Sequence, residues 1–388
     1  MSHSGPDRGE VPIMLTNDSN GLSLPEECKP AVDPAPVRKP RATHKLTPAK
    51  IAAAIRSCGY VGQERAVKAV SLFAYRHLDR LERIKRGLTY NLPRKTNMLL
   101  VGPTGCGKTY LVELLFRKIL KIPTVMIDIT SYTEAGYVGQ DLNSIISRLL
   151  HAANMNVKEA ETGVVCLDEF DKIPMCTSRQ GKDLTGLGVQ RELLKMVEGT
   201  KISVPIEIGN KNDTNRAEIN TANIPFIACG AFSGLKSIIH GGSSNTIGFL
   251  QDNHSTKEKI ADGYTEEEMN ITTAFQRFGF LPELIGRFSR IVPLDALGKD
   301  ALRSILRHNV MSGWKEEMST HKIDMVVDES LIDYIVASAL QRETGARSVE
   351  TTFAQLLEDA AYDAYSSTKT KRLVLKLEQG RPGYRIER

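Results

Sequence analysis

The chain has 388 residues, of which 41% are apolar and 25% charged, and its formal net charge is +5. This composition is ordinary for a globular protein, and the length leaves room for two or three domains. No apolar run approaches the roughly 18 residues of a membrane-spanning helix, and the amino terminus lacks the apolar segment of a signal peptide. The small net charge gives no support for nucleic-acid binding.

The six cysteines are scattered and include no C-x-x-C pair. This spacing argues against a zinc site and against a disulfide framework, and it fits a reducing compartment. We therefore expect a cytoplasmic protein with neither a membrane nor a nucleic acid as its partner.

Residues 1–45 are rich in proline and show no apolar period, which predicts a disordered tail. The tail ends in a basic cluster, Arg38, Lys39 and Arg41. Such a cluster is either a contact for an adaptor or nucleic acid, or a solvated linker.

A helical pattern begins at Leu46, with Thr47 as its expected N-cap and Pro48 as its first helical residue. Gly59 to Glu64 interrupts this helix, and a longer amphipathic helix is expected from Arg65 to about Arg86. The Val-Gly-Gln turn at 61–63 either contacts an adenine base or only caps the second helix.

A glycine-rich loop, Gly102 to Thr109, follows the apolar run Asn97 to Val101 and precedes a helical segment, Tyr110 to Leu120. Its form is G-x-x-x-x-G-K-[ST], the P-loop, placed between a strand and a helix as that motif requires. Backbone N–H groups surround a phosphate, Lys108 adds a cation, and the Thr109 hydroxyl can bind Mg²⁺. The residues expected to bind the nucleotide are Gly102, Pro103, Thr104, Gly105, Cys106, Gly107, Lys108, Thr109 and Tyr110.

Cys106 stands between two glycines of the loop. We interpret it as a small spacing residue and not as a redox group.

A second motif, which contains two acidic residues, indicates ATP hydrolysis. The apolar run Gly163 to Leu167 leads directly into Asp168 and Glu169, which is the Walker B form. A buried strand would deliver Asp168 to the Mg²⁺ ion and place Glu169 where it polarises an attacking water. Further strands are expected at Thr124 to Ile129 and Ile224 to Cys229, so the alternation of strands and helices predicts a doubly wound parallel α/β sheet.

Two loops carry apolar residues where polar ones would be usual. Tyr137 and Val138 lie between two glycines, and Thr246 to Leu250 lies in the middle of a flexible loop expected from Ser233 to Met269. Each segment either binds another polypeptide or packs against the domain. Lys172 to Gly188 is expected to be another loop, followed by a helix from Val189 to Glu198.

A hairpin is expected from Lys201 to Ile219, with a polar tip at 209–216.

The last quarter of the chain predicts a small helical lid domain with one strand. After a strand at Ser289 to Leu294, a hinge is expected at Asp295 to Gly298, which divides the folded part into domains 46–296 and 297–388. The expected lid elements are helices at 299–318, 329–341 and 347–364 and a strand at 372–377.

Several motifs together resemble one family, the ClpX family of AAA+ protein unfoldases, which work with the ClpP peptidase. These motifs occur in the family's order over about residues 46–377: Gly-Pro-Thr-Gly-Cys-Gly-Lys-Thr, Glu-Ala-Gly-Tyr-Val-Gly, Leu-Leu-Lys-Met-Val-Glu-Gly-Thr, Gly-Ala-Phe-Ser-Gly-Leu, Leu-Pro-Glu-Leu-Ile-Gly-Arg and Thr-Gly-Ala-Arg.

The resemblance implies roles for residues that local patterns leave open. Tyr137 and Val138 are similar to the pore-loop pair that grips a substrate polypeptide. Arg287 is similar to the arginine that reaches a neighbouring subunit's nucleotide, and Arg347 to the lid arginine that senses nucleotide in its own subunit. The tripeptide Ile247, Gly248 and Phe249 is similar to the loop that docks into ClpP.

The sequence also departs from the family. Its tail holds Cys28 alone, whereas the family's amino-terminal zinc domain needs two C-x-x-C pairs, so we expect that domain to be lacking. The tip at 209–216 has no Arg-Lys-His sequence, Gln140 stands where Glu is common, and Cys229 stands where a polar residue is usual. The family's substrate preferences are therefore not transferred to this chain.

The resemblance implies an ATP-dependent, Mg²⁺-dependent protein unfoldase that threads protein substrates through a ring hexamer into a ClpP-type peptidase. In this interpretation Glu169, Arg287 and Arg347 are catalytic, and Thr109 and Asp168 hold the metal. The alternative is a remodelling chaperone that works without a peptidase.

Overall fold

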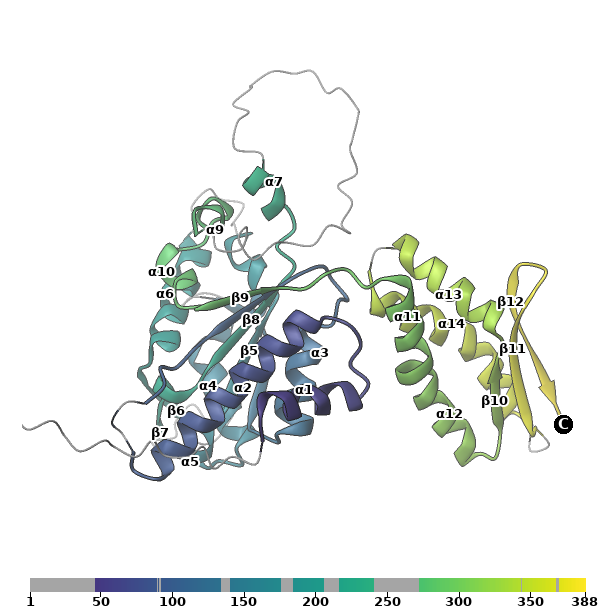
Figure 1. Ribbon diagram of the computed structural model, residues 1–388, viewed down its shortest axis with the longest axis horizontal. Helices are drawn as coiled ribbons and strands as arrows, with labels where there is room; N and C mark the ends of the chain where they lie inside the picture. Colours follow the sequence, from purple (N-terminus) through teal and green to yellow (C-terminus); the bar gives the residue numbers. More distant parts are fainter. Residues whose placement is uncertain are drawn as a thin grey trace, which may run out of the picture. The chain divides into compact units, whose positions relative to one another are not determined.

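The computed structural model describes residues 46–88, 90, 92–133, 140–175, 184–205, 216–240, 272–342, 344–367 and 370–388. A five-stranded parallel sheet organises the described residues up to Pro293 (Figure 1). The order along the sheet is β2-β5-β8-β1-β9, and every neighbouring pair is parallel. The strands are β1 (Met98–Val101), β2 (Thr124–Asp128), β5 (Val164–Asp168), β8 (Phe226–Gly230) and β9 (Arg290–Pro293). The predicted parallel α/β fold is confirmed.

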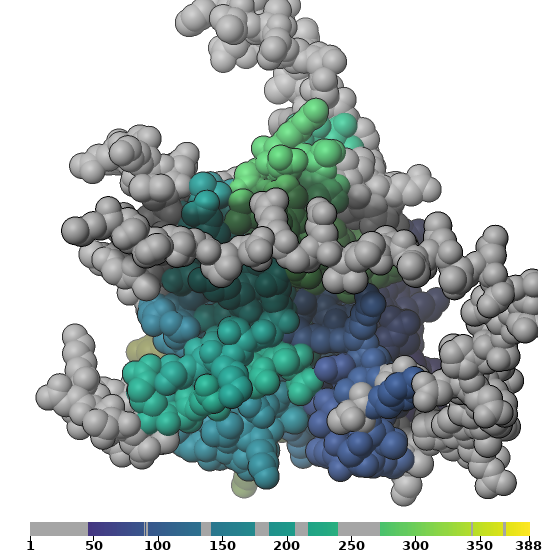
Figure 2. All heavy atoms as spheres, turned by 90° about the vertical axis from the view of Figure 1, so that its left-hand side faces the viewer, coloured from purple at the N-terminus to yellow at the C-terminus, as the bar shows by residue number. Residues whose placement is uncertain are grey.

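Helices cover both faces of this sheet, which explains why its central strands are apolar throughout. Along β1, Met98 and Leu100 enter one hydrophobic cluster with α1, α2 and α3, whereas Leu99 and Val101 enter another with α4, α6 and α9. This alternation follows from the period of two residues in a strand. The helices are α1 (Pro48–Ser57), α2 (Glu64–Lys85), α3 (Lys108–Glu113), α4 (Asn143–Ala152), α5 (Val157–Ala160), α6 (Leu184–Glu198), α9 (Thr272–Phe278) and α10 (Pro282–Ile285). Figure 2 shows α9 and α10, in green, together at the surface.

The first helix begins where the sequence predicts. The Thr47 hydroxyl accepts a hydrogen bond from the backbone N–H of Lys50 at 3.3 Å, and Pro48 occupies the first helical position. This hydrogen bond satisfies one of the backbone N–H groups that have no partner within the first turn. Proline has no backbone N–H, so Pro48 leaves no unpaired donor at its position. The helix after the P-loop also forms as expected, continuing from α3 into a π-helical segment, Leu114–Ile119.

The residues after Leu297 build their own hydrophobic cluster around four helices and a three-stranded sheet of order β10-β11-β12. The prediction of one strand is wrong here. β11 contains the apolar run Leu373 to Leu375, whereas β10 is short and β12 contains Pro382 and Gly383, which weaken the strand pattern. The elements are α11 (Lys299–Ile305), the π-helix η6 (Leu306–Val310), α12 (Met311–Thr320), β10 (Asp324–Val327), α13 (Glu329–Arg342), α14 (Ala346–Tyr365), β11 (Arg372–Glu378) and β12 (Arg381–Glu387).

The predicted loop from Lys172 to Gly188 is wrong at its end, because α6 already begins at Leu184. Gly186 indicated a loop, but it is needed within the helix. A Cβ there would lie 2.7 Å from the carbonyl oxygen of Ile173, in the 3₁₀ segment Phe170–Met175. The glycine therefore allows close packing and does not mark a turn.

Other connections agree with the sequence in part. The hairpin is confirmed as β6 (Lys201–Pro205) paired antiparallel with β7 (Arg216–Asn220). The loop predicted from Ser233 begins instead with a helix, α7 (Leu235–His240). A two-residue parallel pair, β3 (Tyr132–Thr133) with β4 (Gln140–Asp141), was not predicted, because elements of that length have no sequence period. Short 3₁₀ turns occupy Ile129–Ser131 and Thr221–Asn223.

None of the helices in the described part of the chain has the length and hydropathy needed to cross a bilayer.

His77 is buried in α2 with 7% of its surface exposed. Its Nε2 lies 3.0 Å from the carbonyl oxygen of Thr162, just before β5. Burial lowers the pKa of this imidazole to about 4. The hydrogen bond to Thr162 opposes this lowering, and the positive charge of Arg80 adds a smaller lowering. The side chain is therefore neutral in the folded protein at every pH above that value.

We predict that the free energy of unfolding falls as the pH drops from 6.5 to 4. In this range the imidazole of the unfolded chain becomes protonated, whereas that of the folded protein stays mostly neutral. The contribution of His77 is about 3 kcal/mol at 1.36 kcal/mol per pKa unit. Urea unfolding at several pH values checks this. His77→Gln keeps a side-chain N–H donor and should lose this part of the pH dependence, and an unchanged slope in the variant would contradict the assignment.

Candidate functional site

The glycine-rich loop connects β1 to α3 and packs tightly on two other segments. A Cβ at Gly102 would lie 2.5 Å from the carbonyl oxygen of Leu294, and one at Gly105 would overlap the carbonyl oxygen of Thr344. Gly105 and Gly107 also have φ values of 75° and 93°, which side chains rarely adopt. The loop can therefore take this shape only with glycine at these positions.

Lys108 is the first residue of α3, and only 8% of its surface is exposed. Its ammonium donates hydrogen bonds to the carbonyl oxygens of Gly102 at 2.6 Å and Pro103 at 2.9 Å. These bonds hold the side chain across the loop, so a buried cation stands beside the backbone N–H groups that begin the helix. This is a suitable environment for a phosphate group.

The carboxyl end of β5 brings an acid to the same place. The Thr109 hydroxyl donates to Oδ2 of Asp168 at 2.7 Å. A hydroxyl and a carboxylate in contact are oxygen ligands of the kind that Mg²⁺ takes in combination with water and phosphate. These two residues therefore fit a Mg²⁺ ion carried by a nucleotide.

Glu169 has a φ of 53°, in the left-handed region, although it is not glycine. Its backbone N–H donates to Oδ1 of Asp168 at 3.0 Å, which stabilises this turn at the end of β5. A side chain held in an unfavourable backbone conformation is a frequent mark of a functional site.

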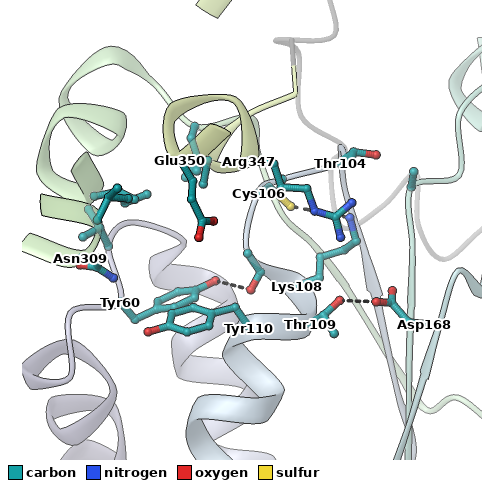
Figure 3. A pocket seen from close by; sticks show the side chains of 18 of the residues that line it. Tyr60, Thr104, Cys106, Lys108, Thr109, Tyr110, Asp168, Asn309, Arg347 and Glu350 are labelled. Carbon is teal, nitrogen blue, oxygen red and sulfur yellow. Dashed lines mark hydrogen bonds between the residues drawn. The ribbon is translucent and has the colours of Figure 1, made fainter. Parts of the chain in front are cut away.

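These groups line one cavity of about 370 Å³ (Figure 3). One end is polar and is formed by the P-loop, Asp168, Glu169 and Arg347. Figure 3 shows Tyr60 and Asn309 at the opposite end, and further lining residues are apolar: Val61, Leu297, Ile305 and Val310. A polar end and an apolar end fit the phosphates and the base of a nucleotide.

Comparisons with known proteins agree with this geometry. Residues 93–291 match the family model of the AAA domain (Cdc48 subfamily), and residues 297–374 match the C-terminal, D2-small domain of ClpB protein. The chain is 36% identical over 324 residues to a protein of Treponema denticola named ATP-dependent Clp protease ATP-binding subunit ClpX, covering 81% of this chain and 77% of that protein.

The chain belongs to the ClpX family. It is an AAA+ ATPase that uses ATP with Mg²⁺, as the sequence motifs predicted.

The predicted site residues of this ClpX-family chain fall into three groups. Thr104 to Thr109, Tyr110, Asp168, Glu169 and Arg347 all line the cavity. Gly102, Pro103 and Arg287 do not line it: the carbonyl oxygens of Gly102 and Pro103 accept the hydrogen bonds of Lys108, and the guanidinium of Arg287 forms an ion pair with Glu198 at the end of α6. Tyr137, Val138, Ile247, Gly248 and Phe249 lie outside the described residues, as do residues 1–45, residues 176–183 of the loop predicted from Lys172, and residues 209–215 of the hairpin tip.

The turn before α2 lies at the cavity and also begins that helix. Gly59, Tyr60 and Val61 line the cavity, and Gln63 is the N-cap residue of α2. The Gln63 side chain makes no capping bond. Instead it donates to the carbonyl oxygen of Asp295 at 2.6 Å and accepts from the Asp295 N–H at 3.1 Å. The turn is therefore fixed to the segment that follows β9.

Tyr60 is a site residue that sequence reasoning missed. Its ring stacks on that of Tyr110, with the ring centroids 6.1 Å apart and the planes inclined by 19°. Its hydroxyl donates to the carbonyl oxygen of Gly107 at 3.3 Å, and burial raises the pKa of this phenol well above its usual value. An aromatic residue directly before the Val-Gly-Gln turn was the only available signal, and its neighbours in space are far away in sequence.

Cys106 is buried with 2% of its surface exposed, and burial raises the pKa of its thiol. A buried thiol with little thiolate character agrees with a spacing role.

The loop and the lid meet directly, because the Ala346 N–H donates to the carbonyl oxygen of Gly105 at 3.0 Å. We predict that Gly105→Ala destabilises the protein by about 1–3 kcal/mol more than Gly62→Ala, since the new methyl group overlaps Thr344. Gly62 is a matched control, with a φ of 73° and no atom within 4 Å of its Cβ position. Denaturant unfolding of both variants measures the difference, and equal losses would contradict the contact.

Proposed function

We propose that this chain unfolds protein substrates by ATP hydrolysis, drives them through the pore of a ring hexamer and delivers them to a ClpP-type peptidase. The observation that supports this most directly is the single cavity that joins Lys108, the Thr109–Asp168 pair, Glu169 and Arg347. The Treponema denticola relative is named as the ATP-binding subunit of a Clp protease, and we extend that pairing to this chain.

Five polar residues of the cavity have proposed roles in ATP binding and hydrolysis. Lys108 exchanges its bonds to Gly102 and Pro103 for phosphate oxygens, and Thr109 and Asp168 hold Mg²⁺. Bound ATP supplies the phosphoryl group that is transferred to water. Glu169 orients that water and accepts its proton, and Arg347 stabilises negative charge that develops on the phosphoryl oxygens.

The chain is proposed to change shape between Asp295 and Gly298, the boundary of its two AAA+ domains. Arg347 lies on α14, and the residues just before it contact Gly105 of the P-loop. A change at the phosphates therefore acts on the start of α14. We propose that this moves the pore residues Tyr137 and Val138, which grip the substrate polypeptide.

Arg287 is proposed to serve a neighbouring subunit. It does not line the cavity of its own chain, and its pairing with Glu198 is exposed on both sides, 52% and 40%. Exposed ion pairs contribute little to stability, about 0–1 kcal/mol, so this arginine is readily released to a nucleotide in the next subunit. An arginine supplied in this way requires an oligomer.

We predict that Glu169→Gln lowers ATP turnover at least about 100-fold, because a general base is lost, while ATP binding changes little. Steady-state hydrolysis and calorimetric binding measure the two effects. Glu159→Gln, at an exposed position of α5, should leave both unchanged. Turnover at the wild-type rate in Glu169→Gln would contradict the assignment.

The same variant tests the proposed partners. With ATP present, Glu169→Gln should retain an added unstructured protein and an added ClpP-type peptidase in one complex. Deletion of Ile247 to Phe249 should remove the peptidase and spare the protein. Retention of the protein by both forms with no peptidase on either would instead favour a chaperone that works alone.

We predict that Arg287→Ala and Glu169→Gln, each nearly inactive alone, recover ATP hydrolysis when their subunits are mixed. The nucleotide site of an Arg287→Ala subunit still contains Glu169, and a neighbouring Glu169→Gln subunit supplies it with Arg287. Hydrolysis is measured over a range of mixing ratios. Activity that stays at the level of the separate variants would show that Arg287 does not act between subunits.

A further inference from the structure

An acidic side chain of the lid, Glu350, lines the nucleotide cavity between its two ends. It lies on α14 one turn after Arg347 and lines the same cavity. Figure 3 shows its carboxylate directed from α14 toward Tyr60 and Tyr110, whereas Arg347 is directed toward Lys108. The two opposite charges on one face of the helix therefore point to different parts of the cavity.

This position is electrostatically unfavourable without a partner. A carboxylate beside a triphosphate site repels the negative charge of the phosphates. Within the part of the chain that the structure describes, Glu350 makes no side-chain hydrogen bond and no ion pair. A ligand that supplies hydrogen-bond donors at this point would offset the repulsion.

The contacts around Glu350 identify the part of the nucleotide that reaches it. The phosphate end is fixed by Lys108 and the Thr109–Asp168 pair. The base end is closed where the Asn309 amide donates to the carbonyl oxygen of Gly59 at 3.1 Å. Figure 3 places Glu350 between these two ends, with Asn309 on one side and Arg347 on the other.

In a nucleoside triphosphate the group between base and phosphates is the sugar, and its only hydrogen-bond donors are hydroxyl groups. A carboxylate accepts from such hydroxyls without needing a donor of its own. We propose that Glu350 binds the ribose 2′-hydroxyl and makes the site selective for ribonucleotides over 2′-deoxyribonucleotides. This role rests on the nucleotide site proposed above and adds a specificity residue carried by the lid.

The test compares binding of ATP and 2′-deoxy-ATP in the Glu169→Gln background, where hydrolysis is slow. Calorimetry with unlabelled nucleotides is required, because the usual fluorescent labels are attached to the ribose. With Glu350 intact, ATP should bind about 10- to 100-fold more tightly than 2′-deoxy-ATP, the range for a hydrogen bond to a charged group.

Glu350→Ala should weaken ATP binding by that factor and leave 2′-deoxy-ATP binding unchanged or slightly tighter. Glu358→Ala is the matched control, since Glu358 is also exposed on α14 but does not line the cavity. It should keep the preference for ATP.

Three results would overturn the proposal. Equal binding of both nucleotides before substitution would show that the sugar is not distinguished. An equal loss for both in Glu350→Ala would show a structural role, and an equal gain would show simple charge repulsion. If neither nucleotide binds to the parent protein, the proposed nucleotide site itself is wrong.

Discussion

The close approach between the P-loop and the start of α14 is the constraint on which the nucleotide site depends. The Ala346 N–H bonds to the Gly105 carbonyl, and a Cβ at Gly345 would lie 2.7 Å from that same oxygen. Two glycines therefore face each other because two backbones meet without side chains between them. This contact brings Arg347 and Glu350 to a cavity whose other wall belongs to the central sheet.

The parallel sheet supplies the remaining groups through its topology. β1 lies next to β8, and β8 lies next to β5, so the carboxyl ends of these strands form one edge. The P-loop follows β1, Asp168 ends β5, and Gly230 ends β8. Ligands of open α/β sheets bind at such an edge. Side chains that are far apart in sequence, such as Thr109 and Asp168, thereby come within hydrogen-bonding distance.

The sequence predicted those parts of the protein in which a local pattern has one physical solution. Thr47 followed by Pro48 can begin a helix, and the apolar run before Asp168 suits a buried parallel strand. It failed where the meaning of a residue depends on its neighbours in space. Gly186 allows close packing of α6 and does not end that helix. Pro382 and Gly383 lie within a strand at the edge of a sheet. Tyr60, Asn309 and Glu350 belong to no motif: Tyr60 reaches the cavity by packing on Tyr110, and Asn309 and Glu350 reach it because the lid packs on the P-loop.

The two hydrogen bonds between Gln63 and Asp295 have a mechanical consequence. A side-chain amide that donates to the carbonyl oxygen and accepts from the N–H of one residue imitates the pairing of a neighbouring strand, so Gln63 holds Asp295 in place just beyond β9. The turn that lines the base end is thus joined directly to the residue at which the linker begins. The movement proposed above would then be taken up by the three residues 296–298, the last of which is Gly298, with no atom within 4 Å of its Cβ position. In the movement proposed above, the base end of the cavity is therefore divided: Gly59 to Val61 stay with the sheet, whereas Ile305, Asn309 and Val310 turn with the lid.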